Sequence, residues 1–567
     1  MPGGTDTRSV RARFGSVRLV LVVTVGALLV RFLALGVRAV HWDEARVGYW
    51  ILRTSATGDW AYRPIIHGPF VQHTTRLVLD TVGPNPYTMR AVVALVGGLL
   101  PLSALLFRTR LADDELVALA VVLAANPLLV HFSRFMRSDV ALAAFAFAAF
   151  GCGLRALDTG RVRWVYAGAL AFALAATAKE NVVLYPLSWA GALALVAAGW
   201  YWTLPADDRA NTLRERLRAV GRGLWGWRGH LLASLALGVV VLVGFYAPRS
   251  GTAGGVGLWN AIGDPTLLPA VVGEATVGSA AKVADVWLAG EMRAHSYLLY
   301  LGYYAVVLAV GAGPLVVLAA AGFVRERGRA LVAFCGWWGL SSAAGYPFVA
   351  DIFAPWLAVH VVVALAVPAA VGLAAAVRRL RRARVDRERT VAVALAALLV
   401  LAGLQVAVVT AETSYRAGPH DFNLLAQGAQ PGSDLNAAMA DAVAATAGTE
   451  GPDVLYVGRM AVDDERENDA PPAASAWYDR LPLPWYTEAA RLDVTSARDP
   501  RAVGPDAPPV VVAAPRHDAL LRDRLPDYRV HEESMLLRAE NRTLSVLGFE
   551  REFEGRTVLI LVRNRTG

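Results

Sequence analysis

The chain contains very little cysteine and almost no lysine. Cys152, Cys335, Lys179 and Lys282 are the complete set of these two residue types in 567 residues. Both cysteines lie inside apolar runs, so we expect neither a disulfide framework nor a cysteine-ligated zinc site. The positive charge comes from arginines that lie between apolar runs rather than in one basic patch, which argues against nucleic acid as a partner.

Apolar residues dominate instead. They make up 56% of the chain and occur in blocks separated by short arginine-rich stretches. This composition is untypical of soluble proteins and indicates a polytopic α-helical membrane protein. Runs long enough to cross roughly 30 Å of hydrocarbon predict about 11 membrane spans. The predicted spans are 19–37, 91–107, 115–131, 139–157, 164–178, 182–202, 230–247, 297–324, 330–348, 356–377 and 391–410.

The arginine content of successive loops predicts the orientation of the chain. Arginines gather in the N-terminal segment 1–18 and in every second loop after it, whereas the intervening short loops carry few charges. Because cytoplasmic loops are enriched in Arg and Lys, residues 1–18 are expected to be cytoplasmic. The transmembrane domain 19–410 then presents its first outer loop, 39–90, and the tail 411–567 to the outside of the cell membrane.

The C-terminal tail differs in character from the rest. Residues 411–567 carry a net charge of −8, whereas the first 410 residues carry +16. Short β-rich runs at 454–457, 509–514 and 558–562 alternate with polar helical stretches. This alternation predicts an extracytoplasmic soluble α/β domain. The tail lacks the glycine-rich fingerprint of a dinucleotide-binding loop.

The first outer loop carries two adjacent carboxylates, Asp43 and Glu44, just beyond the first span. A carboxylate at this interface could act as a general base on an acceptor hydroxyl, or both could be solvated surface charges. Helical spacing of apolar residues predicts short helices around 47–54 and 70–78. A metal held by His41, Asp43 and His67 is conceivable, but these residues lack a recognised ligand spacing, so we expect no metal and no cofactor.

Two further outer loops carry cations. Arg134, Arg137 and Asp139 precede the fourth span, and this combination at a helix start suits a phosphate. The alternative is that the arginines extend to the membrane interface as snorkelling side chains. Lys179 follows the fifth span and could also meet a phosphate, or could form a simple interfacial ion pair with Glu180.

The order of these features resembles the dolichyl-phosphate-mannose protein mannosyltransferase superfamily, the C-type (GT-C) glycosyltransferases, which include lipid A aminoarabinose transferases. The resemblance covers about 31–186. It rests on Asp43-Glu44, on the imperfectly matched His67-Gly68-Pro69-Phe70, on Arg90, on Arg134, Arg137 and Asp139, and on Lys179. Within the superfamily, HWDEA, YRPIIHGPF and the tail segment WYDRLPLPWYTEAA look most like an archaeal subgroup, the flippase-activity-associated proteins of N-glycosylation.

The resemblance implies inverting sugar transfer on the outer face of the membrane from a polyprenyl (dolichyl)-phosphate-linked sugar to a glycan or protein acceptor. Asp43 and Glu44 would be the catalytic residues, with Asp43 either taking the acceptor proton as the base or orienting the acceptor. The residues that would bind the substrate and its lipid phosphate are His67, Arg134, Arg137, Asp139 and Lys179. A competing hypothesis is a non-catalytic protein that binds this lipid and assists its flipping or hand-over together with a flippase partner. A third makes the tail domain the functional part, binding glycan or a partner protein.

Overall fold

The computed structural model describes residues 7–64, 68–250, 256–288, 296–350, 354–416, 425, 430–469, 471–536 and 556–564. The chain divides into two compact units. The membrane unit comprises Met1–Leu33, Trp60–Val71 and Val93–Ser414, and the sheet unit comprises Ala34–Asp59, Gln72–Val92 and Tyr415–Gly567. Two segments of the predicted first outer loop therefore group with the C-terminal tail.

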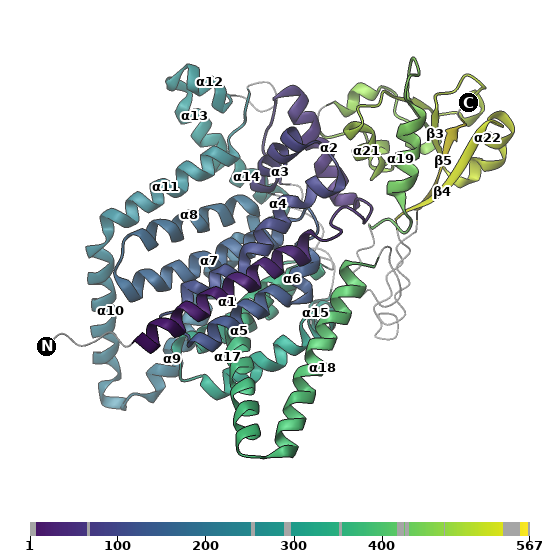
Figure 1. Ribbon diagram of the computed structural model, residues 1–567. Helices are drawn as coiled ribbons and strands as arrows, with labels where there is room; N and C mark the ends of the chain where they lie inside the picture. Colours follow the sequence, from purple (N-terminus) through teal and green to yellow (C-terminus); the bar gives the residue numbers. More distant parts are fainter. Residues whose placement is uncertain are drawn as a thin grey trace. The chain divides into compact units, whose positions relative to one another are not determined.

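Where the structure describes it, the membrane unit consists of helices and the loops that join them (Figure 1). Its long helices are α1 (Thr7–Phe32), α5 (Asp113–Ala125), α7 (Ser138–Thr159), α8 (Arg163–Ala178), α9 (Leu184–Thr203), α10 (Arg209–Gly226), α11 (Arg228–Tyr246), α15 (Tyr297–Glu326), α16 (Ala330–Val349), α17 (Ala358–Val385) and α18 (Arg389–Ser414). Its shorter helices are α6 (Pro127–Phe132), α12 (Leu258–Gly263), α13 (Leu268–Gly273) and α14 (Ser279–Leu288). Helix α4 (Pro86–Leu99) enters this unit from the sheet unit and continues as the 3₁₀ helix η1 (Leu100–Phe107).

Within the described residues, 9 helical segments are long and apolar enough to cross a membrane. They are Gly15–Phe32, Pro86–Phe107, Ser138–Thr159, Glu180–Thr203, Arg228–Tyr246, Pro265–Asp285, Tyr297–Glu326, Pro355–Val385 and Arg389–Ser414. Eight of them overlap predicted spans, which confirms the polytopic helical fold. The segment Pro265–Asp285 lies between the predicted spans 230–247 and 297–324, where we expect a loop and no span.

Three further predicted spans are helical but are too short or not apolar enough to be counted with the nine: 115–131, 164–178 and 330–348. The first is interrupted because Pro127 lacks an N–H group and disfavours helical geometry at the residue before it. Asn126 is accordingly extended, and its side chain accepts hydrogen bonds from the backbone of Leu128 and Leu129 to start α6. The result is two short helices, α5 and α6, in place of one span.

Helix α17 forms the centre of the membrane unit. Of its most apolar window, 89% is buried, and it packs against α5, α15 and α16. Because proline is tolerated in membrane helices where neighbours compensate the lost hydrogen bond, Pro368 leaves α17 continuous. The same central position encloses the first turn of α17, which carries His360.

The sheet unit contains a five-stranded sheet in the order β2-β1-β3-β5-β4. The strands are β1 (Val454–Val457), β2 (Val494–Ala497), β3 (Val510–Ala513), β4 (Tyr528–Leu536) and β5 (Arg556–Arg563). β1 pairs in parallel with β2 and β3, whereas β5 pairs antiparallel with β3 and β4. The predicted α/β tail is thus confirmed, including the three strands expected at β1, β3 and β5.

Alternate residues of these strands are buried on opposite faces, as the period of two requires. Val510 and Val512 pack in one core cluster with α19 (Leu435–Ala445), and Val511 and Ala513 pack in the other with α22 (Asp518–Arg524). The unit also contains α20 (Ser475–Tyr478) and α21 (Leu483–Ala489). The two helices expected in the first outer loop form as α2 (Trp42–Thr57) and α3 (Pro69–Val82), and α2 packs against α21.

Candidate functional site

Asp43 and Glu44 lie in the first turn of α2 and help to start that helix. His41 is the residue before the helix; its Nδ1 accepts a hydrogen bond from the Asp43 backbone at 3.0 Å. The Glu44 carboxylate in turn accepts one from the His41 N–H at 3.0 Å. This reciprocal capping box satisfies backbone donors that a helix start otherwise leaves unpaired.

Glu44 is also clamped by Arg90 of α4. Nε of Arg90 donates to Oε1 of Glu44 at 2.9 Å, and Nη2 donates to Oε2 at 2.7 Å. The remaining N–H groups of Arg90 donate to the backbone carbonyls of Leu35, Arg38 and Ala39. Glu44 and Arg90 are 1% and 0% exposed, so the pair is closed to solvent.

The charge state of Glu44 follows from this clamp. Burial by itself raises the pKa of Glu44. The charge and the hydrogen bonds of Arg90, with a smaller contribution from Arg38, lower this pKa by more than burial raises it. The pKa of Glu44 therefore lies well below its usual range. Glu44 is an ionised, buried group that fixes the start of α2, which differs from the solvated surface charge considered from the sequence.

Asp43 is the carboxylate of the pair that reaches solvent. Its side chain is 22% exposed, and its Oδ2 lies 3.8 Å from Nδ1 of His41. Because its backbone N–H bonds the His41 ring and its neighbour Glu44 is clamped, the position of Asp43 is set by two anchored residues. This combination of a fixed backbone and an accessible carboxylate suits a general base.

His67 lies outside the described residues, but the glycine after it is informative. The Gly68 N–H donates to the carbonyl of Ala178, at the end of α8, at 2.9 Å. A Cβ atom on Gly68 would lie 2.4 Å from the carbonyl oxygen of Thr177. Neither the hydrogen bond nor the space is available to a proline, which explains physically why this motif departs from the expected histidine-proline pair.

Asp139 and Lys179 form the centre of a buried polar cluster in the membrane unit. Nζ of Lys179 donates to both carboxylate oxygens of Asp139, at 2.9 and 3.0 Å. Asp139 is in the first turn of α7, and Lys179 follows the last residue of α8. Their exposures are 0% and 7%, so Lys179 pairs with a buried partner rather than with Glu180 at the interface.

His360 and Tyr185 complete this cluster, and we did not predict either of them. Nε2 of His360 lies 3.4 Å from Oδ1 of Asp139, and its Nδ1 is hydrogen-bonded to the Tyr185 hydroxyl at 2.8 Å. Tyr346 stacks on the imidazole with ring centroids 4.7 Å apart. The available signal was an ionisable residue inside a predicted span, which is costly there and commonly functional.

The two predicted arginines are both 4% exposed, so they do not snorkel to the membrane surface. Nη1 of Arg134 donates to the carbonyls of Val30, Arg31 and Leu33, around the end of α1. Arg137 holds its guanidinium carbon 3.8 Å from the ring centroid of Trp356. Trp356 precedes α17, which carries His360, so Arg137 and the Asp139 cluster meet the same end of that helix.

The predicted site residues therefore fall into two groups. Asp43 and Glu44 belong to the sheet unit, whereas Arg134, Arg137, Asp139 and Lys179 belong to the membrane unit. In the latter group, Asp139 contacts both His360 and Lys179, and Arg137 adds a second positive charge near Asp139. The two cations outnumber the one carboxylate, which leaves net positive charge that could attract an anion. Within the described residues, no three His, Cys, Asp or Glu side chains gather as metal ligands. The set considered from the sequence includes His67, which lies outside these residues, so the expectation that no metal binds stays a prediction.

Comparison with known proteins bears out the resemblance. Residues 66–204 match the family model of dolichyl-phosphate-mannose-protein mannosyltransferases. Residues 435–546 match the model of the Agl23 flippase-associated protein C-terminal domain. The first match contains the whole Asp139–Lys179 pair, and the second covers most of the sheet unit's tail. No curated protein matches the chain in sequence.

Solved structures agree on the fold. ArnT from Cupriavidus metallidurans in the apo state is similar with a TM-score of 0.54 at 18% identity, over 96% of this chain and 97% of that chain. The same protein bound to undecaprenyl phosphate is similar with a TM-score of 0.52 at 17% identity, again over 96% and 97%. The chain therefore has the fold of ArnT along nearly its whole length.

Proposed function

We propose that this protein binds a polyprenyl-phosphate-linked sugar and transfers the sugar to an acceptor on the outer face of the cell membrane. The observation that carries the proposal is the buried cluster of Asp139, Lys179 and His360, with Arg137 beside it. It lies within the segment that matches the mannosyltransferase model, and it supplies cations at the ends of membrane helices, where a lipid phosphate resides.

The chemistry assigned to each group balances as follows. Asp43 takes the proton of the acceptor hydroxyl while the oxygen of that hydroxyl forms a bond to the anomeric carbon of the sugar. The bond from that carbon to the phosphate oxygen breaks, and the polyprenyl phosphate leaves with the electron pair. Lys179 and Arg137 stabilise the negative charge that grows on the leaving phosphate. Such electrostatic stabilisation of the transition state is usually the largest single contribution to catalysis. Glu44 positions Asp43 through the start of α2.

Orientation is part of the proposal. The alternation of arginine between loops supports a cytoplasmic N-terminus and a sheet unit on the outside. Both native cysteines are buried, so they give little background to an impermeant thiol reagent. In intact cells, Asp80→Cys in α3 should be labelled by such a reagent, and Arg327→Cys after α15 should be labelled only after lysis. The reverse pattern would contradict the orientation.

The transferase reading is tested by Asp43→Asn. The full-length protein is given radiolabelled dolichyl-phosphate mannose, and we expect this variant to retain the lipid while label transfer falls by about 100-fold or more, the usual effect of losing a general base. Asp80→Asn is the matched control, since Asp80 is an exposed acid of α3 that pairs only at the surface with Arg76. Equal loss of transfer in both variants would remove Asp43 from the mechanism.

A second function is favoured by the match of 435–546 to the flippase-associated domain model. In that case the protein holds the same lipid and hands it on without transferring sugar. This non-catalytic function predicts that Asp43→Asn has no effect on lipid translocation measured in vesicles. Removing Lys179 should abolish that translocation. Transfer of label by the wild-type protein that depends on Asp43 would rule out a purely non-catalytic role.

A further inference from the structure

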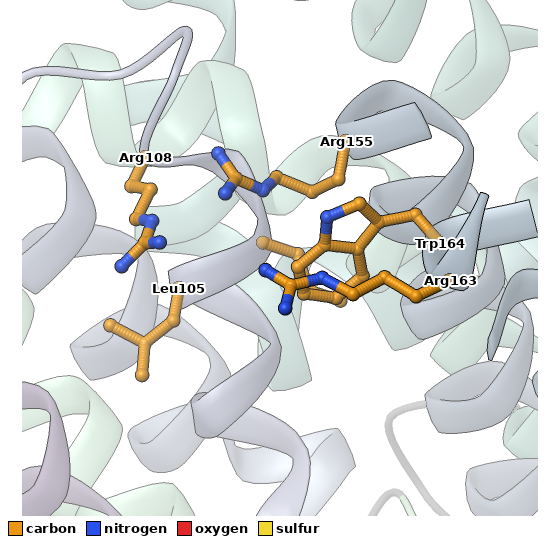
Figure 2. Close-up of a pocket in the computed structure, with 6 residues that line it drawn as sticks. Leu105, Arg108, Arg155, Arg163 and Trp164 are labelled. Carbon is orange, nitrogen blue, oxygen red and sulfur yellow. The ribbon is translucent and has the colours of Figure 1, made fainter. Parts of the chain in front are cut away.

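Three arginines surround a pocket that lies away from the Asp139 cluster. The pocket has a volume of about 390 Å³ and is lined by Arg108, Arg155 and Arg163 together with Trp164. Figure 2 shows the three guanidinium groups gathered around one space, with the indole of Trp164 beside them. We call this space the arginine pocket.

Within the described residues, Asp158 offsets part of the charge of Arg155 from a distance, but the three positive charges of the arginine pocket outnumber this one acid. None of its three arginines forms an ion pair or donates a side-chain hydrogen bond there. The nearby acid, Asp158, is already engaged by Arg110 at 2.6 Å and by Thr109. Three like charges around one space repel each other, and an anion between them removes that repulsion.

Arg155 is the residue that separates a built site from ordinary loop charge. A cytoplasmic loop needs only exposed arginines to orient a membrane protein, as Arg161 and Arg163 are. Arg155, by contrast, is 4% exposed on α7. Burying a guanidinium without an anion is costly, so its place is explained by a ligand that the pocket accommodates.

Trp164 links the arginine pocket to a second space. The guanidinium carbons of Arg155 and Arg163 lie 5.3 and 5.1 Å from its ring centroid. Its buried indole N–H has no hydrogen-bond partner within the described residues, which leaves a further donor at this point. Trp164 also lines a cavity of about 860 Å³, the apolar cavity, whose walls include Phe150, Phe172 and Leu224.

The two spaces together have the chemistry of one amphipathic ligand. Arginine binds phosphate through paired, charge-assisted hydrogen bonds, and basic pockets between membrane helices bind lipid head groups. The apolar cavity is walled by residues of α7, α8, α9, α10 and α11 and offers a place for a hydrocarbon chain attached to that phosphate. Its volume lies within the usual range of roughly 300–1,000 Å³ for ligand sites.

The position in the fold separates this site from the one described above. Arg155 comes 16 residues after Asp139 along α7, which corresponds to about 24 Å at 1.5 Å per residue. Trp164 lies in the first turn of α8, whereas Lys179 follows the last residue of that helix. The α7–α8 pair therefore carries a cationic cluster at each end, separated by nearly the thickness of the hydrocarbon layer.

We infer that the arginine pocket and the apolar cavity form a second site, which binds the phosphate of a lipid with its chain in the apolar cavity. The ligand is either a phospholipid with a terminal phosphate or a polyprenyl phosphate, and both share the phosphomonoester that the arginines recognise. The inference stands whether or not the protein transfers sugar, because no residue of the Asp43 or Asp139 groups takes part.

The test uses the full-length protein in phosphatidylcholine nanodiscs and two photoreactive probes, phosphatidic acid and undecaprenyl phosphate, each with the reactive group on its chain. We expect cross-links to map to α7, α8 or α10 for at least one probe, and its affinity to fall about tenfold or more in Arg155→Gln, as loss of a charge-assisted hydrogen bond predicts. Arg161→Gln, an exposed arginine outside the pocket, should leave that affinity unchanged. The probe that labels identifies the lipid class.

A second variant tests the binding of the lipid's hydrocarbon chain without changing the charges of the arginine pocket. Gly153 lines the apolar cavity, and a Cβ atom there meets no heavy atom within 4 Å, so Gly153→Leu should fill the cavity while the protein still folds. It should weaken the lipid probe and leave inorganic phosphate binding as it was. Inorganic phosphate that competes as well as the lipid would show a free-anion site and overturn the lipid proposal. Cross-linking that is the same in the wild type, in Arg155→Gln and in Gly153→Leu would overturn the proposed site altogether.

Discussion

Arg90 donates every N–H group of its guanidinium to the segment that precedes and begins α2. Two of these hydrogen bonds go to the carboxylate of Glu44. The pair is sealed from solvent and holds the start of α2 against the start of α4. Removing one member of a buried ion pair leaves an uncompensated charge, which costs far more than the pair contributes net.

The first prediction follows from this pair. Arg90→Leu should lower the free energy of unfolding by about 3–5 kcal/mol, because Glu44 then remains buried without a partner. Thermal unfolding in detergent micelles measures the change. Arg76→Leu is the matched control: Arg76 pairs with Asp80 at the surface, where an ion pair contributes about 0–1 kcal/mol. Similar losses in the two variants would mean that Arg90 holds nothing in place.

The second prediction concerns pH. In the wild type, the pKa of Glu44 is lowered in the folded state, so the unfolded state binds more protons and stability falls as pH drops below the unfolded value of about 4.3. In Arg90→Leu, burial, the largest single influence, raises the pKa of Glu44 in the folded state, and only the smaller effects of Arg38 and the His41 N–H still oppose it. The folded variant then gains protons first, so its stability deficit should shrink as pH falls from 7 toward 5.

Unfolding curves of both proteins at several pH values measure this difference. The triple comparison with Glu44→Gln in the Arg90→Leu background isolates the group, since that variant has no carboxylate to titrate. A deficit that stays constant from pH 7 to pH 5 would show that Glu44 is solvated once Arg90 is gone.

The third prediction concerns Gly68. Gly68→Ala places a methyl group 2.4 Å from the carbonyl oxygen of Thr177, against backbone that cannot move aside cheaply. We expect a loss of about 1–3 kcal/mol in the free energy of unfolding, the usual cost of overpacking. Gly199→Ala in α9, where the added Cβ meets nothing within 4 Å, should instead be neutral or slightly stabilising. An unchanged melting temperature in Gly68→Ala would mean that the turn adapts.

Much of the fold is readable from sequence because it depends on local patterns. Apolar runs and the period of two predict most spans and three of the strands, and Pro127 could have predicted the break between α5 and α6. The different fates of Asp43 and Glu44 are also implicit in a helix, where successive residues point about 100° apart, so one faces inward and the other outward. The resemblance to the mannosyltransferase superfamily instead implies that both residues are catalytic.

The remainder depends on contacts between distant segments. His360 lies against Asp139 and Tyr185, residues that are 221 and 175 positions away in the chain. No spacing within one helix encodes such a meeting. The grouping of the first outer loop with the tail is of the same kind: it requires hydrogen bonds such as that from the Gln430 amide to the carbonyl of Ala39.

The last prediction separates structure from ligand binding at Lys179. Lys179→Gln leaves Asp139 buried without its cation and should cost about 3–5 kcal/mol of stability. The double variant Lys179→Met with Asp139→Leu removes both charges, so it should recover most of that stability, as apolar replacements of buried ion pairs commonly do. If Lys179 contacts the lipid phosphate, the double variant will fold but bind dolichyl phosphate about tenfold or more weakly.

Lys282→Gln provides the control for this comparison, since Lys282 is the other lysine of the chain and pairs with Glu274 in a half-exposed position. It should change stability by no more than about 1 kcal/mol and leave lipid affinity unaltered. A double variant that regains both stability and affinity would confine the Asp139–Lys179 pair to holding α7 and α8 together. In that outcome, phosphate recognition would rest on the predicted arginines, and Arg137→Gln should then weaken it strongly.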